Sequence, residues 1–129
     1  MRTLTDHIVS GDQAVQLTVS VLDEPGQGGA CHQYQITGPS GVQEFPGGGA
    51  YQYCNIAFQN GPIKEFGVNG ITHEALLAIN IDRLRSFQAG PYAGSDNAEA
   101  LDHMEKALAC LQRRTLARIK RGVEGTNAK

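Results

Sequence analysis

The sequence predicts an α+β fold, with an N-terminal antiparallel β-sheet in residues 1–70 and a C-terminal antiparallel two-helix hairpin with a tail in residues 71–129. Two observations lead to this prediction. Twelve of the 16 glycines and four of the five prolines fall in the first range, where they separate short runs of alternating polar and apolar residues. In the second range, apolar residues recur at helical spacing. Because 129 residues suffice for one modest core, we expect the two parts to form one compact unit.

Three runs in the first part have the alternating pattern of half-buried strands, and they are residues 16–22, 32–37 and 51–58. The segments between and around them are rich in glycine and proline, as turns are, and they are residues 25–29, 38–41 and 46–49. Strands joined by short loops form an antiparallel meander. None of the glycine-rich loops has the G-x-x-x-x-G-K-[ST] pattern of a phosphate-binding loop, so we interpret them as hairpin loops.

The first predicted helix begins after Thr72, whose side chain is suited to cap it, and extends to Gln88. Its apolar residues recur near helical spacing, and they are Leu76, Ile79, Leu84 and Phe87. Residues 90–94 contain two glycines and a proline, which break the helix.

Asp96 and Glu99 have the spacing of a capping box and predict the start of the second helix. That helix should run to about Lys120 and end at Gly122, because glycine is the preferred residue just past a helix C-terminus. Two helices joined by so short a loop pack as an antiparallel hairpin.

A helical wheel divides the second helix into two adjoining faces. One is a core stripe that consists of Leu101, Met104, Leu108, Leu111 and Thr115. The other carries Arg114, Arg118 and Arg121, with Arg118 nearest the core. Cations near a helix C-terminus complement the helix dipole, whereas guanidinium groups also bind phosphates bidentately. The arginines alone favour the first interpretation and leave the second open.

Charge is distributed unevenly along the chain. Residues 106–129 hold seven basic residues and one acidic residue, although the whole chain has a net charge of −2. A basic end on an otherwise acidic chain indicates an anionic partner. We expect a small anion and no long nucleic acid, because the acidic remainder would repel an extended phosphate backbone.

Other patterns bear on compartment and catalysis. Cys31, Cys54 and Cys110 lack paired spacing, so we interpret them as reduced, buried thiols of a cytoplasmic protein. No run is long and apolar enough to cross a membrane, and the N-terminus has no secretory pattern. The histidines fall in no metal-binding or catalytic motif, and there is no nucleophile elbow. We therefore expect no enzyme activity, no metal and no cofactor.

Two further groups are candidates for binding. Phe87 and Tyr92 flank the break between the helices, where an aromatic ring either stacks on a purine or closes the end of the hairpin core. Asn97 lies in the first turn of the second helix, where it either contacts a ligand or helps to cap the helix. The segment 122–126 combines two glycines with Val123 and Thr126, a composition that a loop shaped around a ligand can have, although disorder is the default for a terminus.

Residues 72–126 resemble a known family through F-Q-A-G-P-Y-A at 87–93, Asn97, R-R-T-L-A-R at 113–118 and R-G-V-E-G-T at 121–126. These segments are similar to the helical-hairpin domain of phage cyclic-nucleotide sponges. That domain is shared by the first type of Thoeris anti-defence protein and by a smaller anti-CBASS sponge. The β-rich first half makes the chain more similar to the Thoeris type, although no motif is recognised there.

The resemblance implies that the protein sequesters cyclic ADP-ribose isomers. It assigns base stacking to Phe87, a polar ligand contact to Asn97, and phosphate binding to Arg114 and Arg118. We expect Arg121, Val123 and Thr126 to complete this ligand-binding site. The resemblance also implies a homo-oligomer, a dimer or a hexamer built as a trimer of dimers, with a separate intersubunit site for cyclic trinucleotides. The alternatives are a hydrolase of the same signal and an adaptor whose basic hairpin binds an acidic protein.

Overall fold

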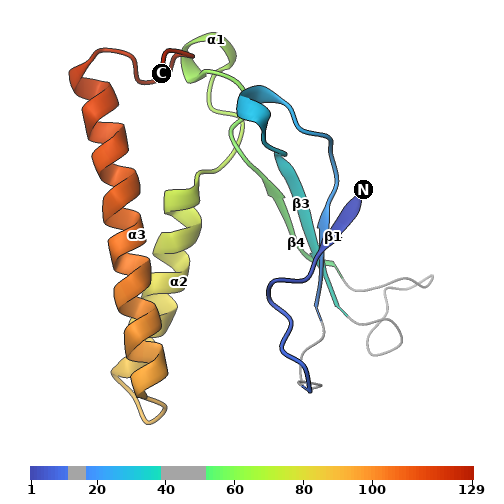
Figure 1. Ribbon diagram of the computed structural model, residues 1–129, viewed down its shortest axis with the longest axis vertical. Helices are drawn as coiled ribbons and strands as arrows, with labels where there is room; N and C mark the ends of the chain where they lie inside the picture. The colour runs from blue at the N-terminus through green and yellow to red at the C-terminus, as the bar shows by residue number, and fades with distance from the viewer. Residues whose placement is uncertain (12–16, 39–51) are drawn as a thin grey trace. The chain divides into compact units, whose positions relative to one another are not determined.

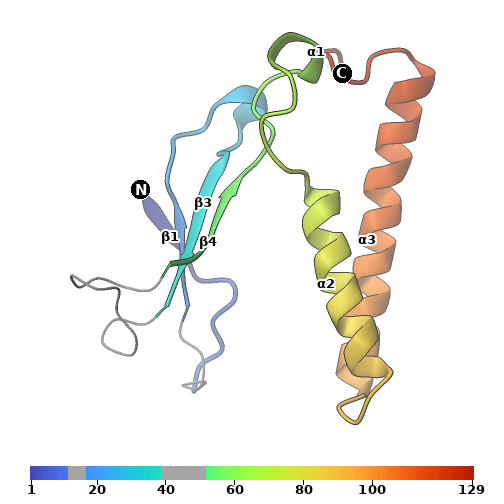
Figure 2. The same cartoon turned by 180° about the vertical axis from the view of Figure 1, so that it is seen from behind.

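The computed structural model describes residues 1–11, 17–38 and 52–129 (Figures 1 and 2). The chain divides into two compact units. The first consists of Met1–Gly61 and Val68–Gly70 and holds the sheet, and the second consists of Pro62–Gly67 and Ile71–Lys129 and holds the helices. The expectation that sheet and helices form one compact unit stays a prediction.

The sheet of the first unit is an antiparallel meander, as predicted. Its four strands lie in the order in which they follow along the chain, and they are β1 (Arg2–Leu4), β2 (Thr18–Val21), β3 (Gln33–Thr37) and β4 (Gln52–Ala57). Each neighbouring pair is antiparallel, with a register irregularity in the β3–β4 pair between Ile36 and Thr37. The sequence did not predict β1, because three residues are too few to show an alternating pattern.

The connection between β2 and β3 is closed by Asp23. Its carboxylate accepts the backbone N–H groups of His32, at 2.9 Å to Oδ2, and of Gln33, at 3.0 Å to Oδ1. Burial raises the pKa of Asp23, but these hydrogen bonds outweigh it and leave the pKa below its ordinary value. The predicted turn at 25–29 contains the short 3-10 helix η1 (Gln27–Gly29). The predicted turns at 38–41 and 46–49 lie, apart from Gly38, outside the described residues, as do residues 16 and 51 of the predicted strands.

A short helix, α1 (Ile63–Phe66), belongs to the second unit and was not predicted. Four residues are too few to show helical periodicity, and the sequence around them, G-P-I-K-E-F-G, lies in the range 1–70 that is predicted to form the sheet. Gly67 follows α1 with φ 71°, a conformation that glycine adopts without strain.

The hairpin of the second unit is formed by α2 (His73–Gln88) and α3 (Ser95–Lys120), which pack side by side and run antiparallel (Figures 1 and 2). Thr72 caps α2 as predicted, with its Oγ1 accepting the N–H of Ala75 at 3.2 Å. The α3 helix ends as predicted: Gly122 has φ 72°, and the N–H of Val123 reaches back to the carbonyl of Arg118.

The capping box predicted at Asp96 and Glu99 is wrong. The N-cap of α3 is Gly94, and no side chain caps the helix there. Gln88 fixes this start, because its side chain accepts the N–H of Gly94 at 3.0 Å and donates to the carbonyl of Gly94 at 3.1 Å. Asp96 lies in the first turn of α3, where its charge is favourable to the helix dipole.

The five residues of the predicted core stripe of α3 are all half-buried, and none is fully buried. On α2, Leu76, Leu84 and Phe87 are half-buried as the helical spacing predicts, but Ile79 is 65% exposed and Ile81 is the buried isoleucine. The prediction of buried cysteines holds for Cys31 and is wrong for Cys54 and Cys110, which are exposed. Among the described residues, no helix is long and apolar enough to span a membrane.

Candidate functional site

The predicted ligand residues lie toward the two ends of the α2–α3 hairpin. Phe87 and Asn97 lie next to the bend between the helices, and Arg114 and Arg118 lie in the last turns of α3 (Figure 1). We call these regions the bend end and the tail end. Since a helix rises about 1.5 Å per residue, the distance along the α3 axis from Asn97 to Arg118 is roughly 30 Å. A small nucleotide therefore cannot contact both ends of one straight hairpin.

At the bend end, two aromatic rings and one arginine lie together. The rings of Phe87 and Tyr92 meet edge to face with centroids 6.5 Å apart. The guanidinium carbon of Arg83 lies 5.1 Å from the centroid of Phe87, in cation–π contact. Tyr92 is 75% exposed, so it does not close a hairpin core. Asn97 is half-buried in the first turn of α3.

An open groove with a volume of about 460 Å³ runs along the face of α2 that carries Phe87. Its described lining residues recur at helical spacing, and they are Ile79, Asp82, Arg83, Ser86 and Phe87. Arg83 and Asp82 were not predicted as candidates. The signal that points to Arg83 is its position four residues before Phe87, which places the two side chains on one helix face.

At the tail end, the three predicted arginines differ in their surroundings. Arg114 is exposed and has no hydrogen-bond or ion-pair partner among the described residues. Arg121 is exposed and donates to the main-chain oxygen of Lys129. Arg118 is half-buried, and its side chain is only 16% exposed, as its predicted position nearest the core requires.

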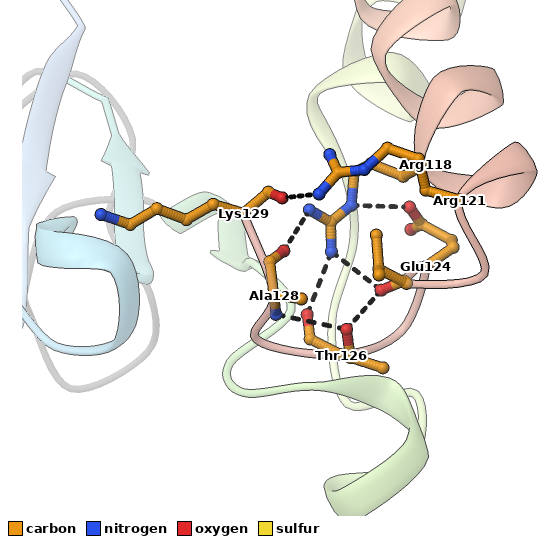
Figure 3. A network of polar contacts seen from close by, with 7 residues as sticks. Arg118, Arg121, Glu124, Thr126, Ala128 and Lys129 are labelled. Carbon is orange, nitrogen blue, oxygen red and sulfur yellow. Dashed lines mark hydrogen bonds and ion pairs between the residues drawn. The ribbon is translucent and has the colours of Figure 1, made fainter.

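The guanidinium group of Arg118 lies inside a loop formed by the tail that follows α3 (Figure 3). Its Nε donates to Oε2 of Glu124 at 3.0 Å. Its Nη2 donates to the carbonyls of Val123 and Thr126, both at 3.1 Å, and its Nη1 donates to the carbonyl of Ala128 at 2.6 Å. Charged hydrogen bonds of this kind order a chain segment that would otherwise fray.

Hydrogen bonds within the tail also stabilise it, and the tail contacts α1. The backbone N–H of Thr126 donates to the carbonyl of Val123 at 3.1 Å, and its hydroxyl donates to the same oxygen. Gly125, with φ 82°, accepts the N–H of Lys64 at 3.1 Å, so α1 supports the tail from outside. Val123 and Thr126, both predicted as ligand contacts, are half-buried in this loop. Of the two interpretations of 122–126, the structure therefore shows the loop, and it is shaped around Arg118 of its own helix.

Glu124 is the functional residue that the sequence analysis missed in the tail. It is the one acidic residue in the basic segment 106–129, and this position was the available signal. For cofactors and metals, the described residues contain no group of three or more His, Cys, Asp or Glu side chains placed to hold a metal ion.

Comparison with known proteins identifies the family of the hairpin. Residues 51–116 match the Acb2/Tad1 hairpin domain, and that range contains the whole of α2 and most of α3. The chain is also similar to a protein named Thoeris anti-defense 1 from Bacillus phage SBSphiJ7, with 41% identity over 88 residues. The similar region is 68% of this chain and 59% of that relative. The chain is thus a homologue of Thoeris anti-defense 1 and belongs to the family that carries the Acb2/Tad1 hairpin domain.

Proposed function

We propose that the protein binds cyclic ADP-ribose isomers and sequesters them without degrading them, so that a Thoeris defence system loses its signal. The observation that carries the proposal is the tail end of the hairpin, where Arg114, exposed and without a partner among the described residues, lies one helical turn from the ordered Arg118. Residues at i and i+4 share a helix face, so the two guanidinium groups can meet adjacent phosphates of one diphosphate. The relationship to Thoeris anti-defense 1 supports a role against the Thoeris system, and the signal class is part of this proposal.

The separation of the two ends supports a site made by two chains. In this arrangement Phe87 of one copy stacks on the base, and Asn97 of the same copy contacts the base region. The phosphates are bound by the arginines of another copy, which are Arg114, Arg118 and Arg121. Exposed apolar side chains on the hairpin supply the surface for such a contact, with Ile79 65%, Leu116 59% and Ile119 55% exposed. We therefore propose a dimer as the smallest binding unit, which a hexamer repeats as a trimer of dimers.

The energetics require the ligand to be enclosed. Each hydrogen bond from an arginine to a phosphate contributes about 1.5–3 kcal/mol, and stacking on Phe87 contributes about 1–3 kcal/mol. Two such hydrogen bonds and one stacking interaction together correspond to roughly micromolar affinity before the entropy of association is subtracted. A sponge must hold its ligand more tightly, so Val123 and Thr126 of the tail are proposed to close over it and exclude water.

The family relationship also supports a second site, for cyclic trinucleotides, between subunits and separate from the first. The proposal of binding without turnover is supported by the chemistry of the predicted site. Its predicted side chains are three arginines, an asparagine, a phenylalanine, a valine and a threonine, and none of these is a usual general base for hydrolysis at neutral pH. The carboxylate of Glu124, which contacts them, is paired with Arg118. Hydrolysis of the same signal and binding of an acidic protein are the two alternatives that an experiment must separate.

The test is a release experiment. Purified protein is incubated with cyclic ADP-ribose isomers and passed through a size filter, and the retained protein is denatured and both fractions are analysed by mass spectrometry. A sponge retains the nucleotide and releases it intact only after denaturation. A cleaved product would make the protein a hydrolase. Free nucleotide throughout, with every isomer, would contradict the proposal and leave the adaptor or another cyclic nucleotide.

A further inference from the structure

The side chain of Arg118 is engaged before any ligand arrives (Figure 3). A guanidinium group has five N–H donors, and the tail accepts four hydrogen bonds from Arg118 through Glu124, Val123, Thr126 and Ala128. Nε is held by the carboxylate of Glu124, and Nη2 donates to two carbonyls. A phosphate that binds Arg118 at Nε must therefore first displace Glu124.

The acceptors of Nε and Nη2 differ in how firmly they are held. The carbonyls of Val123 and Thr126 belong to a main-chain turn that is closed by the N–H and the hydroxyl of Thr126 and by the contact between Gly125 and Lys64. The Glu124 carboxylate is held by Arg118 alone among the described residues, and its side chain is 41% exposed. Glu124 can turn into water by a change of side-chain rotamer, which leaves the turn intact.

We propose that Glu124 is an internal competitor of the ligand at Arg118. Its carboxylate occupies Nε of Arg118 in the unliganded chain and leaves it when a ligand phosphate binds. The exchange conserves charge at the guanidinium, because one singly charged oxyanion replaces another. The carbonyls of Val123 and Thr126 keep Nη2 oriented throughout, so Arg118 does not need Glu124 to stay in place. This inference rests on the proposed function insofar as it takes a phosphate as the incoming group.

The competition has a consequence for occupancy. An arginine that is already paired binds every phosphate ligand more weakly, since the apparent affinity falls with the fraction of chains whose site is open. The factor is the same for a small anion and for the full nucleotide. A ligand with a second phosphate for Arg114 and a base for the bend end gains further contacts, so it still binds when a single small anion, already weakly bound, does not.

The experiment uses the full-length variant Glu124→Gln and the wild-type protein. Each is titrated with cyclic ADP-ribose and, separately, with inorganic pyrophosphate. Because the pair is partly exposed, removing the competitor should tighten binding of both probes about two- to fivefold. Glu105→Gln is the matched control, since it removes the same charge from an exposed position of α3 that pairs with Arg85 at 3.8 Å. Its affinities should stay within twofold of wild type.

A second measurement follows Arg118 directly. The Nε–H signal of Arg118 in an NMR spectrum should be protected from solvent exchange in the wild-type protein and exposed in Glu124→Gln. Added pyrophosphate should shift this signal in both proteins, at lower concentration in the variant. Glu124→Ala is included in case the glutamine side chain replaces the lost contact, and it must tighten binding as well.

The outcomes are distinguishable. Tighter binding in both Glu124 variants and not in Glu105→Gln supports the inference. Unchanged or weaker binding in the Glu124 variants overturns it, since a carboxylate that positions Arg118 would weaken binding when removed. If cyclic ADP-ribose binds to none of the proteins, the proposed function fails, and the pyrophosphate titration alone decides the inference. Pyrophosphate that leaves the Arg118 signal unmoved in every variant also overturns it.

Discussion

The bend end and the tail end of the hairpin solve the same problem, the ordering of a helix terminus, with different chemistry. At the bend end, Gln88 pairs with both main-chain polar groups of Gly94, and these are neutral hydrogen bonds. At the tail end, the charged Arg118 donates hydrogen bonds to a carboxylate and three carbonyls. Neutral bonds fix the bend and leave its aromatic rings available. Charged bonds fix the tail with the same side chain that is proposed to bind the ligand.

This difference indicates separate contributions to binding. The bend end offers an aromatic face and a half-buried amide, which provide stacking and orientation. The tail end offers positive charge, which provides affinity for phosphates and makes binding sensitive to salt. Since the ends lie roughly 30 Å apart along α3, a substitution at one end should leave the structure of the other end unchanged. The predictions below use this independence.

The largest effect is expected from Arg114→Ala. The exposed, unpaired guanidinium of Arg114 supplies charged hydrogen bonds of about 1.5–3 kcal/mol to a phosphate, so affinity for cyclic ADP-ribose should fall about tenfold to more than a hundredfold. Isothermal titration calorimetry measures the change. Arg113→Ala is the control, because Arg113 is exposed and its Nη2 contacts Sγ of Cys110. Equal losses in the two variants would mean that the basic segment acts only through its total charge.

The next effect is expected from Phe87→Ala at the bend end. Loss of one stacking interaction should weaken binding by about 1–3 kcal/mol, with no change in salt dependence. The decisive form of this experiment mixes the Phe87→Ala and Arg114→Ala proteins after subunit exchange. If each site combines the bend end of one chain with the tail end of another, a mixed dimer holds one intact site and one doubly altered site.

Mixing equal amounts should therefore restore roughly a quarter of the high-affinity sites, if the dimers form at random. Equilibrium dialysis with a low concentration of the nucleotide counts these sites. No recovery after verified subunit exchange would contradict the two-chain site and would require both ends to act within one chain. A control mixture of Arg114→Ala with Arg118→Ala should recover nothing, because both substitutions alter the same end.

The comparison of ends also shows how far the sequence predicts the structure. The start of α2, the ends of α2 and α3 and three of the four strands follow from periodicity and from Thr72, Gln88 and Gly122, because these signals are local. Arg118 was placed next to the core by the helical wheel, yet its contacts with Glu124 were not foreseen. Those contacts form only because the chain turns back after Gly122, which has φ 72°. Whether a side chain points toward the tail or toward a ligand depends on tertiary contacts, which a local sequence pattern does not contain.

At the bend end, a local sequence pattern gave a wrong prediction because a contact with a residue outside the pattern overrides it. The capping box at Asp96 and Glu99 is a local pattern, and it failed because Gln88 fixes Gly94 in an extended conformation and starts α3 at Ser95. The short elements β1 and α1 were missed because three or four residues are stabilised by pairing and contacts and carry no periodic signal. Sequence patterns predict long elements, and contacts between distant residues decide the ends.

A smaller effect, mainly on stability, is expected from Gln88→Ala. Two exposed hydrogen bonds to Gly94 are lost, so the hairpin should lose about 1 kcal/mol of unfolding free energy in urea denaturation. Gln112→Ala on α3 is the control, because Gln112 is exposed and has no polar partner among the described residues. Affinity for the nucleotide should fall as well, since Phe87 and Asn97 depend on this bend for their positions. A variant as stable as the control would show that Gln88 does not fix the bend.

At the tail end, Gly125→Ala should act locally. Gly125 has φ 82°, which strains any other residue by about 1 kcal/mol. The added Cβ would also lie 3.3 Å from Cγ of Lys64. The amides of the tail should exchange hydrogen faster while the melting temperature of the hairpin changes little. Gly90→Ala at the bend is the control, because its Cβ meets no atom closer than 3.6 Å and its φ is not positive. Faster exchange in both variants would remove the distinction between the ends.

The smallest effect concerns the stretch of α3 between the two ends, where Asp102 and Lys106 form an ion pair at 2.7 Å. The hydrogen bond from Lys106 lowers the pKa of Asp102 below its ordinary value of 3.8 and raises that of Lys106. A lowered pKa in the folded state means that the stabilisation is present above the unfolded value and is lost as pH falls through the folded one. Both side chains are exposed, so only a slight loss of helix stability below about pH 4 is expected. Asp102→Asn should remove that part of the pH dependence in circular dichroism, whereas Arg114→Ala should preserve it. An unchanged acid profile in Asp102→Asn would assign the effect to other carboxylates and leave the middle of α3 stabilised by packing alone.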